Sequence, residues 1–80
     1  MPTLLNSHGY RFYFYSHEAG EPPHVHIDKA GGTMKVWLDD LGVAKSRGFR
    51  SRDHGAILAI VEEHRAAMLE AWHEYFDQDR

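Results

Sequence analysis

Apolar and polar residues alternate along two stretches of the chain, residues 24–28 and 33–39. Alternation with a period of two is typical of a half-buried β-strand, because successive side chains of a strand point to opposite faces. Ala30-Gly31-Gly32 joins the two stretches and suits a hairpin turn, since glycine adopts positive φ without steric cost. The aromatic-rich residues 10–15 predict another strand, and residues 3–6 predict a short one before it.

This alternation divides the strand residues into an apolar and a polar set. Because a small sheet needs one covered face, we expect the apolar set to form the core. Its members are Tyr10, Phe12, Phe14, Val25, Ile27, Met34, Val36 and Leu38. The polar set, expected to face away from the helix, is Arg11, Tyr13, Tyr15, His24, His26, Asp28, Lys35, Trp37 and Asp39.

A long amphipathic helix is predicted after Gly48, with Ser51 as its N-cap and an end near Phe76. Its apolar side follows helical spacing through Ile57, Val61, His64, Met68, Trp72 and Tyr75. Such a helix would span about 38 Å, whereas a strand of six residues spans about 20 Å. We therefore expect part of the helix to extend beyond the sheet.

Together these elements predict the α+β class, with an antiparallel sheet of three to four strands packed against one long C-terminal helix. No linker, repeat or low-complexity segment divides the chain, so we expect residues 1–80 to form one domain. Within it, the sheet is predicted for residues 3–39, a basic connection for residues 40–50 and the helix for residues 51–77.

The composition indicates how this domain is stabilised and where in the cell it is expected. The chain has 80 residues, no cysteine, seven histidines and a formal net charge of −3. The absence of cysteine excludes disulfides and thiolate zinc sites, so stability must come from burial. Met1 to Ser7 lack the features of a signal peptide, and no segment has the length of a membrane span. A cytoplasmic location without membrane contact is expected.

His24 and His26 are the sharpest candidates for chemistry, because residues i and i+2 of a strand project from the same face. Two imidazoles can serve as catalytic general acid and base at a phosphate, or as neutral ligands of a divalent metal. The groups that could complete a metal site are His17, Glu18, Glu21 and Asp28. A solvated polar strand is the third interpretation. Because a bare His-x-His is a weak metal signal, we assign no metal or other cofactor.

Two further groups indicate a nucleic-acid surface. A basic run precedes the helix at Lys45, Arg47, Arg50 and Arg52. Free backbone N–H groups at the start of a helix also attract phosphate, although a solvated basic loop is the plain alternative. The polar strand face also carries rings on which unpaired bases could stack, at Tyr13, Tyr15 and Trp37, and these lie next to the cations Arg11 and Lys35. The alternative is that the first strand or residues 39–50 pack over these rings.

The apolar side of the helix is wider than one sheet face requires, because Leu58, Leu69 and Phe76 form a shoulder beside the main stripe. We expect this shoulder, together with Trp72, to bind a partner protein or a second copy of the chain. The alternative is that the first strand or residues 39–50 fold over it.

Several short motifs occur together along the chain: Met1-Pro2-Thr3, Gly9-Tyr10-Arg11-Phe12, Glu21-Pro22-Pro23-His24-Val25-His26, Arg47-Gly48-Phe49 and Leu69-Glu70-Ala71-Trp72-His73-Glu74-Tyr75-Phe76. In this combination the sequence resembles the small bacterial family catalogued as domain of unknown function 4160. The resemblance implies a component of a toxin–antitoxin-type gene pair, with a cognate small protein as partner and a nucleic-acid-directed activity. The sequence departs from the family pattern after Phe49, where Arg50 to Gly55 replace a serine and a leucine-rich helix start.

Two main hypotheses follow. The first is a toxin-like domain that binds or cleaves RNA, in the latter case as a ribonuclease-like hydrolase, with His24 and His26 at the scissile phosphate. The second is a non-catalytic interaction module that binds a partner protein through the helix shoulder. A metal-dependent enzyme remains a third reading of the two histidines.

Overall fold

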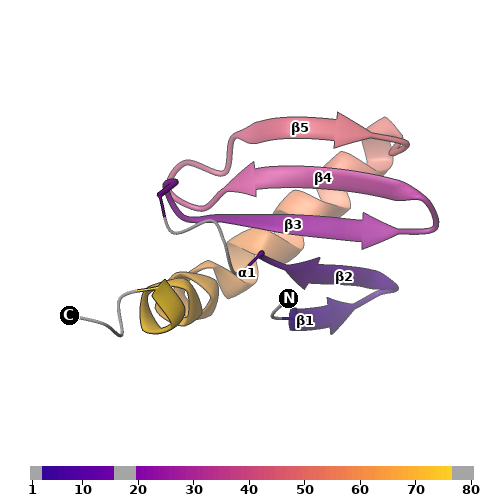
Figure 1. Ribbon diagram of the computed structural model, residues 1–80. Coiled ribbons are helices and arrows are strands. Elements are labelled where there is room, and N and C mark those ends of the chain that lie inside the picture. The colour runs from indigo at the N-terminus through magenta and orange to yellow at the C-terminus, as the bar shows by residue number, and fades with distance from the viewer. Residues whose placement is uncertain (1–2, 16–19, 77–80) are drawn as a thin grey trace.

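The computed structural model describes residues 3–15 and 20–76. The described elements are the strands β1 Thr3–Ser7, β2 Tyr10–Tyr13, β3 His24–Lys29, β4 Gly32–Trp37 and β5 Val43–Arg47, and the helix α1 Ser51–Phe76. Neighbouring strands are antiparallel, and the sheet follows chain order, β1-β2-β3-β4-β5 (Figure 1). The α+β class and the long C-terminal helix are confirmed. Residue 77, included in the predicted helix, lies outside the described residues.

The expected number of three to four strands is wrong, because β5 is a fifth strand within the segment predicted as a basic connection. β5 pairs with β4 through Lys45 opposite Lys35 and Arg47 opposite Thr33. All five of its residues are exposed. An exposed edge strand has no buried face and therefore no alternation of apolar and polar residues, which is why the sequence pattern did not reveal it.

Two tight turns set the register of the first four strands. His8-Gly9 joins β1 to β2 and Ala30-Gly31 joins β3 to β4, and all four residues have positive φ, between 48° and 88°. Two positive φ values in succession define the type I′ turn, whose twist matches that of the flanking strands. The predicted hairpin turn at Ala30-Gly31-Gly32 is confirmed, although Gly32 is already the first residue of β4.

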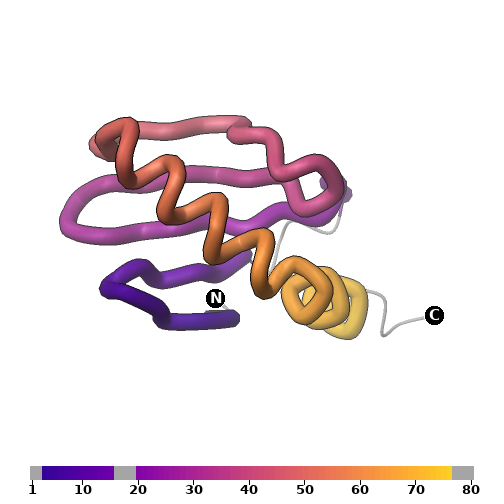
Figure 2. The backbone as a smooth tube through the Cα atoms, turned by 180° about the vertical axis from the view of Figure 1, so that it is seen from behind, coloured from indigo at the N-terminus to yellow at the C-terminus, as the bar shows by residue number. Residues whose placement is uncertain are grey.

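One face of the sheet forms the core beneath α1, which crosses it diagonally (Figure 2). All eight residues of the predicted apolar set are buried, at 5% exposure or less. The helix contributes Ile57, Ile60, Val61 and Met68 to the core cluster. The predicted helix stripe is wrong at two positions, since the side chain of His64 is 38% exposed and Tyr75 is 38% exposed.

The start of α1 is capped by Asp53 and not by Ser51, which is already helical. The Arg50 carbonyl accepts a hydrogen bond from the His54 N–H, while the Asp53 carboxylate accepts one from the Arg50 N–H at 3.0 Å. Tyr10 also donates its hydroxyl to Asp53 at 2.9 Å, which ties the helix start to β2. These hydrogen bonds from Arg50 and Tyr10 lower the pKa of Asp53.

The C-terminal turns of α1 run past the end of the sheet where β2 stops and β3 begins (Figures 1 and 2). The Arg65 guanidinium anchors this half by donating to the carbonyl oxygens of Leu38 and Asp39. Beyond it, Trp72 and Phe76 pack on Phe14, with ring centroids 5.3 Å away in both cases. No helix in the described part of the chain is both long and apolar enough to span a membrane.

Replacing Gly48 by alanine should destabilise the protein by about 1–2 kcal/mol, because Gly48 has a φ of +79° and an added Cβ would lie 3.0 Å from the Gly32 Cα. The matched control is Gly55→Ala, within the helix, where an added Cβ meets nothing within 4 Å. That change should stabilise the protein by about 0.5–1 kcal/mol. Urea unfolding of the two variants measures both effects, and changes of equal sign would contradict this assignment.

Replacing Asp53 by asparagine should reduce the pH dependence of stability in acid. The pKa of Asp53 is lowered in the folded state, so its charged form stabilises the fold above the ordinary carboxyl pKa of about 3.9. That contribution is lost as the pH falls through the lowered pKa. The wild type should be more stable than Asp53→Asn near neutral pH, and the two unfolding curves should converge in acid. Curves that stay parallel across this range would refute the argument.

Candidate functional site

The sheet face opposite α1 carries most of the predicted polar set, and we call it the open face. Its side chains are Arg11, Tyr13, Tyr15, His26, Asp28, Thr33, Lys35, Trp37, Lys45 and Arg47. Antiparallel pairing arranges them in rows across the strands. One row runs through Tyr13, His26, Lys35 and Lys45, and the next through Arg11, Asp28, Thr33 and Arg47. The register therefore gathers rings and cations that are far apart in sequence.

His26 lies at the centre of the aromatic part of the open face. Its ring stacks on Tyr13 with a centroid separation of 5.5 Å and meets the edge of Tyr15 at 4.8 Å. The side chain is half-buried. His26 thus keeps an accessible surface while its neighbours hold its orientation.

Tyr13 is part of this cluster but is only 3% exposed, so the predicted role of its ring as a stacking surface is wrong. The Arg11 guanidinium covers the ring at 4.6 Å from its centroid, and the hydroxyl donates to Asp28 at 2.9 Å. Burial, with hydrogen bonds to Tyr15 and Asp28, raises the pKa of Tyr13 far above its ordinary value. Tyr13 is a neutral support for the residues around it.

His24 is fully buried, so the expectation that both rings of the pair face solvent is wrong. Its Nδ1 lies 2.9 Å from the Pro22 carbonyl oxygen, to which it donates a hydrogen bond. The ring packs between Trp37 and Trp72, with centroid separations of 5.4 and 4.9 Å. The C-terminal half of α1 brings Trp72 to this position at the start of β3, and this contact could not be read from the strand alternation.

The ring of His24 also touches that of His26, at a centroid separation of 5.1 Å. His24 therefore joins the aromatic cluster of the open face to the cluster of Phe14, Trp72 and Phe76 at the helix end. A substrate phosphate cannot contact both imidazoles while His24 is enclosed, and a two-histidine acid–base site does not fit this geometry.

The open face has two hollows, and Tyr15 lines both. The larger hollow has a volume of about 580 Å³ and is lined by Tyr15, His26, Thr33, Met34, Lys35, Trp37, Ala44, Lys45 and Arg47. A second hollow, of about 480 Å³, lies against Arg11, Asp28 and the β3–β4 turn. Both volumes fall in the range of small-ligand sites.

The cations that line the larger hollow differ in whether they form an ion pair. The Lys35 ammonium bonds to Glu21 at 2.8 Å and lies 4.6 Å from the centre of the Trp37 ring. Lys45 and Arg47 are exposed on β5, and neither forms an ion pair within residues 3–15 and 20–76. The two β5 cations are thus the ones best placed to meet an incoming anion.

Arg50 and Arg52, the other two residues of the predicted basic run, do not join this face. They lie at the start of α1, which packs on the opposite side of the sheet. The basic run is therefore divided by Gly48, with Lys45 and Arg47 on the open face and Arg50 and Arg52 at the helix start.

The four residues predicted to bind a partner are largely used within the chain. Trp72 is only 4% exposed, and Leu58 and Leu69 are partly buried against the core. Phe76 is partly buried beside Trp72, at a ring separation of 4.3 Å. Leu4 and Leu5 of β1, and Leu41 and Phe49 of residues 39–50, pack against the same core as Leu58 and Leu69.

Among residues 3–15 and 20–76, no group of three or more histidine, aspartate or glutamate side chains is arranged to hold a metal ion. Glu21 and Asp28, two of the proposed completing groups, instead bond to Lys35 and Tyr13. His17 and Glu18 lie outside the described residues.

Sequence reasoning missed one residue of the site, Thr33, which lines both hollows together with Tyr15. The period-two alternation had already placed Tyr15 on the polar face. Thr33 could be found only from the register, which sets it beside Arg47 and Asp28.

Comparison with known proteins gives one match. The model of the family described as a domain of unknown function, DUF4160, matches residues 9–73, which is most of the chain. The resemblance seen in the sequence motifs is confirmed. No curated protein and no solved structure matches the chain.

Replacing His24 by alanine should cost about 2–4 kcal/mol of stability, because it removes a fully buried ring and leaves a cavity between two tryptophans. His26→Ala is the matched control, since His26 is half-buried on the same strand, and should cost less than about 1 kcal/mol. Urea unfolding of both variants at neutral pH provides the comparison. Equal losses would show that His24 is not the more tightly packed of the two.

Proposed function

The chain belongs to the DUF4160 family, and we propose from its own geometry that its open face binds single-stranded RNA. The observation that carries this proposal is the larger hollow, which brings half-buried aromatic rings and cations together on one sheet face: Tyr15, His26 and Trp37 with Lys35, Lys45 and Arg47. Single-stranded nucleic acids are bound by this combination, because bases stack on rings while cations meet the phosphates.

In this proposal, the bases stack on the accessible rings of the larger hollow. Tyr15, His26 and Trp37 are half-buried there, so each keeps part of its ring exposed. A base in the hollow would contact one of these rings, and the supporting contacts of Tyr13 and His24 hold His26 in place. Rigid rings of this kind bind bases at low cost in side-chain entropy.

The phosphates contact the cations of β5. Lys45 and Arg47 are two residues apart on one strand and share the open face with Lys35 and Thr33. They border the hollow that the rings line, so one strand of RNA could present a base to the rings and its phosphates to β5. Double-stranded RNA fits less well, since its bases are stacked on one another and are not free to enter the hollow.

The proposal is restricted to binding. Cleavage by a pair of histidines needs both rings at the scissile phosphate, and His24 is enclosed by Trp37 and Trp72. If the chain is part of a toxin–antitoxin-type pair, as the family resemblance implies, it would on this proposal act by capturing RNA. RNA binding would then depend on Lys45 and Arg47 and not on His24.

Lys45→Ala together with Arg47→Ala should weaken RNA binding and lower its salt dependence. Each lost phosphate contact should reduce the slope of log K against log salt by about 0.7 for a single strand. Fluorescence anisotropy with labelled oligouridylate and oligoadenylate of about ten nucleotides, over a salt series, measures this slope. Tyr15→Ala should instead cost about 1–3 kcal/mol of binding free energy and leave the slope unchanged.

The matched control is Arg50→Ala together with Arg52→Ala, which removes the same charge from the helix start. Binding by this variant should stay close to that of the wild type. Equal losses in both double variants would show that net charge and not the open face determines binding. Absence of wild-type binding at low salt would reject the proposal outright.

A further inference from the structure

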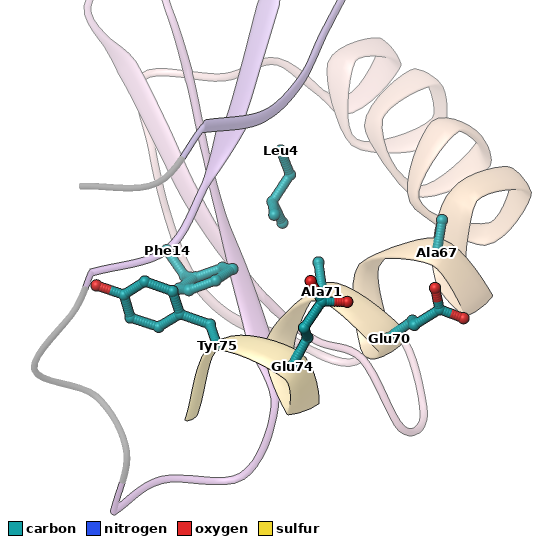
Figure 3. A pocket seen from close by; sticks show the side chains of 7 residues that line it. All are labelled: Leu4, Phe14, Ala67, Glu70, Ala71, Glu74 and Tyr75. Atoms are coloured by element: carbon teal, nitrogen blue, oxygen red, sulfur yellow. The ribbon is translucent and has the colours of Figure 1, made fainter. Parts of the chain in front are cut away.

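A groove separates β1 from the C-terminal half of α1, on the side of the molecule away from the open face. Figure 3 shows Leu4 from β1 facing Ala67 and Ala71 across this groove, with Phe14 and Tyr75 at one end. Its volume is about 320 Å³, and a smaller apolar hollow of about 80 Å³ continues it toward Leu5 and Met68. We call this feature the β1–α1 groove.

The apolar wall of the groove results from a bulge in β1. Thr3 lies opposite Tyr13 and Leu5 opposite Phe12, so Leu4 is an extra residue in the ladder. A bulge of this kind breaks the strict alternation of side chains. Both Leu4 and Leu5 therefore pack toward the core side, and both remain only partly buried.

The helical wall combines small and acidic side chains. Ala67 and Ala71 are one turn apart, and their size leaves the space of the groove open. Glu70 and Glu74, also one turn apart, are exposed along its rim (Figure 3). No lysine or arginine lines the groove, and His64 borders only its smaller part. An apolar floor with a carboxylate rim is complementary to an apolar segment flanked by cations.

We propose that the β1–α1 groove binds a basic amphipathic helix of a partner protein. Apolar side chains of this helix contact Leu4, Ala67 and Ala71, and its lysines or arginines pair with Glu70 and Glu74. Docking of an amphipathic helix in an apolar groove is a common mode of peptide recognition. The surface differs from the predicted helix shoulder, because Leu58, Leu69, Trp72 and Phe76 line neither part of the groove.

Two other occupants fit less well. Addition of a sixth strand to β1 is disfavoured, because a five-residue strand interrupted by a bulge is a poor edge for pairing. A second copy of the chain pairing through β1 would bring the sequence Thr3-Leu4-Leu5-Asn6-Ser7, which has no basic residue. Glu70 and Glu74 would then lack a counter-charge.

The test uses the full chain and a capped synthetic peptide with leucines on one helical face and lysines beside them. Titration of isotope-labelled protein, followed by NMR, should give saturable one-to-one binding with shifts at Ala67 and Ala71. Glu70→Lys with Glu74→Lys should weaken binding about tenfold or more, as expected for the loss and reversal of close charge pairs. The same peptide with glutamate in place of lysine should bind this double variant and not the wild type.

The matched control is Asp39→Lys with Glu62→Lys, which makes the same change of charge at exposed positions outside the groove. Its affinity for the lysine peptide should stay within about twofold of the wild type, since distant surface charges are screened. An equal loss in both variants would overturn the proposal in favour of unspecific attraction. A dimeric mass of the free protein that becomes monomeric on Ala71→Trp would also overturn it, because a second copy would then occupy the groove.

Discussion

A single helix can cover only one face of a sheet, and this constraint determines how the molecule is divided. The core consists of the apolar strand residues and the inner side of α1, all on one face. The opposite face must remain in contact with water or with a ligand, so it takes the polar half of each alternating strand. The candidates for nucleic-acid contact that the structure brings together therefore lie on this second face, because α1 covers the first.

The second half of α1 modifies this division at one end of the sheet. Arg65 holds the helix to the carbonyl oxygens that follow β4, and the turns beyond it carry Trp72 to the beginning of β3. His24 is enclosed as a result, although it belongs to the polar half of its strand. The enclosed ring supports His26, which in turn contacts Tyr13 and Tyr15. The packing of the helix end and the geometry of the open face are therefore physically connected.

Charge is separated in the same way as apolar surface. Lys35, Lys45 and Arg47 lie on the open face, whereas Glu70 and Glu74 lie on the helix beside β1. The net charge of −3 hides this separation, because it sums two regions of opposite sign. On the two proposals made above, the basic open face takes an anionic ligand and the acidic rim of the β1–α1 groove a basic one.

The sequence alone determined the elements with a buried face, because local patterns of polarity and glycine predict the period-two strands, the hairpin turn at Ala30-Gly31-Gly32 and the long helix. It also determined the core set, since alternation identifies which half of a strand is apolar. Only the tertiary structure decided that β5 is a strand, that His24 is buried, and that Lys45 joins the open face while Arg52 does not. These outcomes depend on pairing register and on the path of α1, and both are set by contacts between residues distant in sequence, which no local periodicity records.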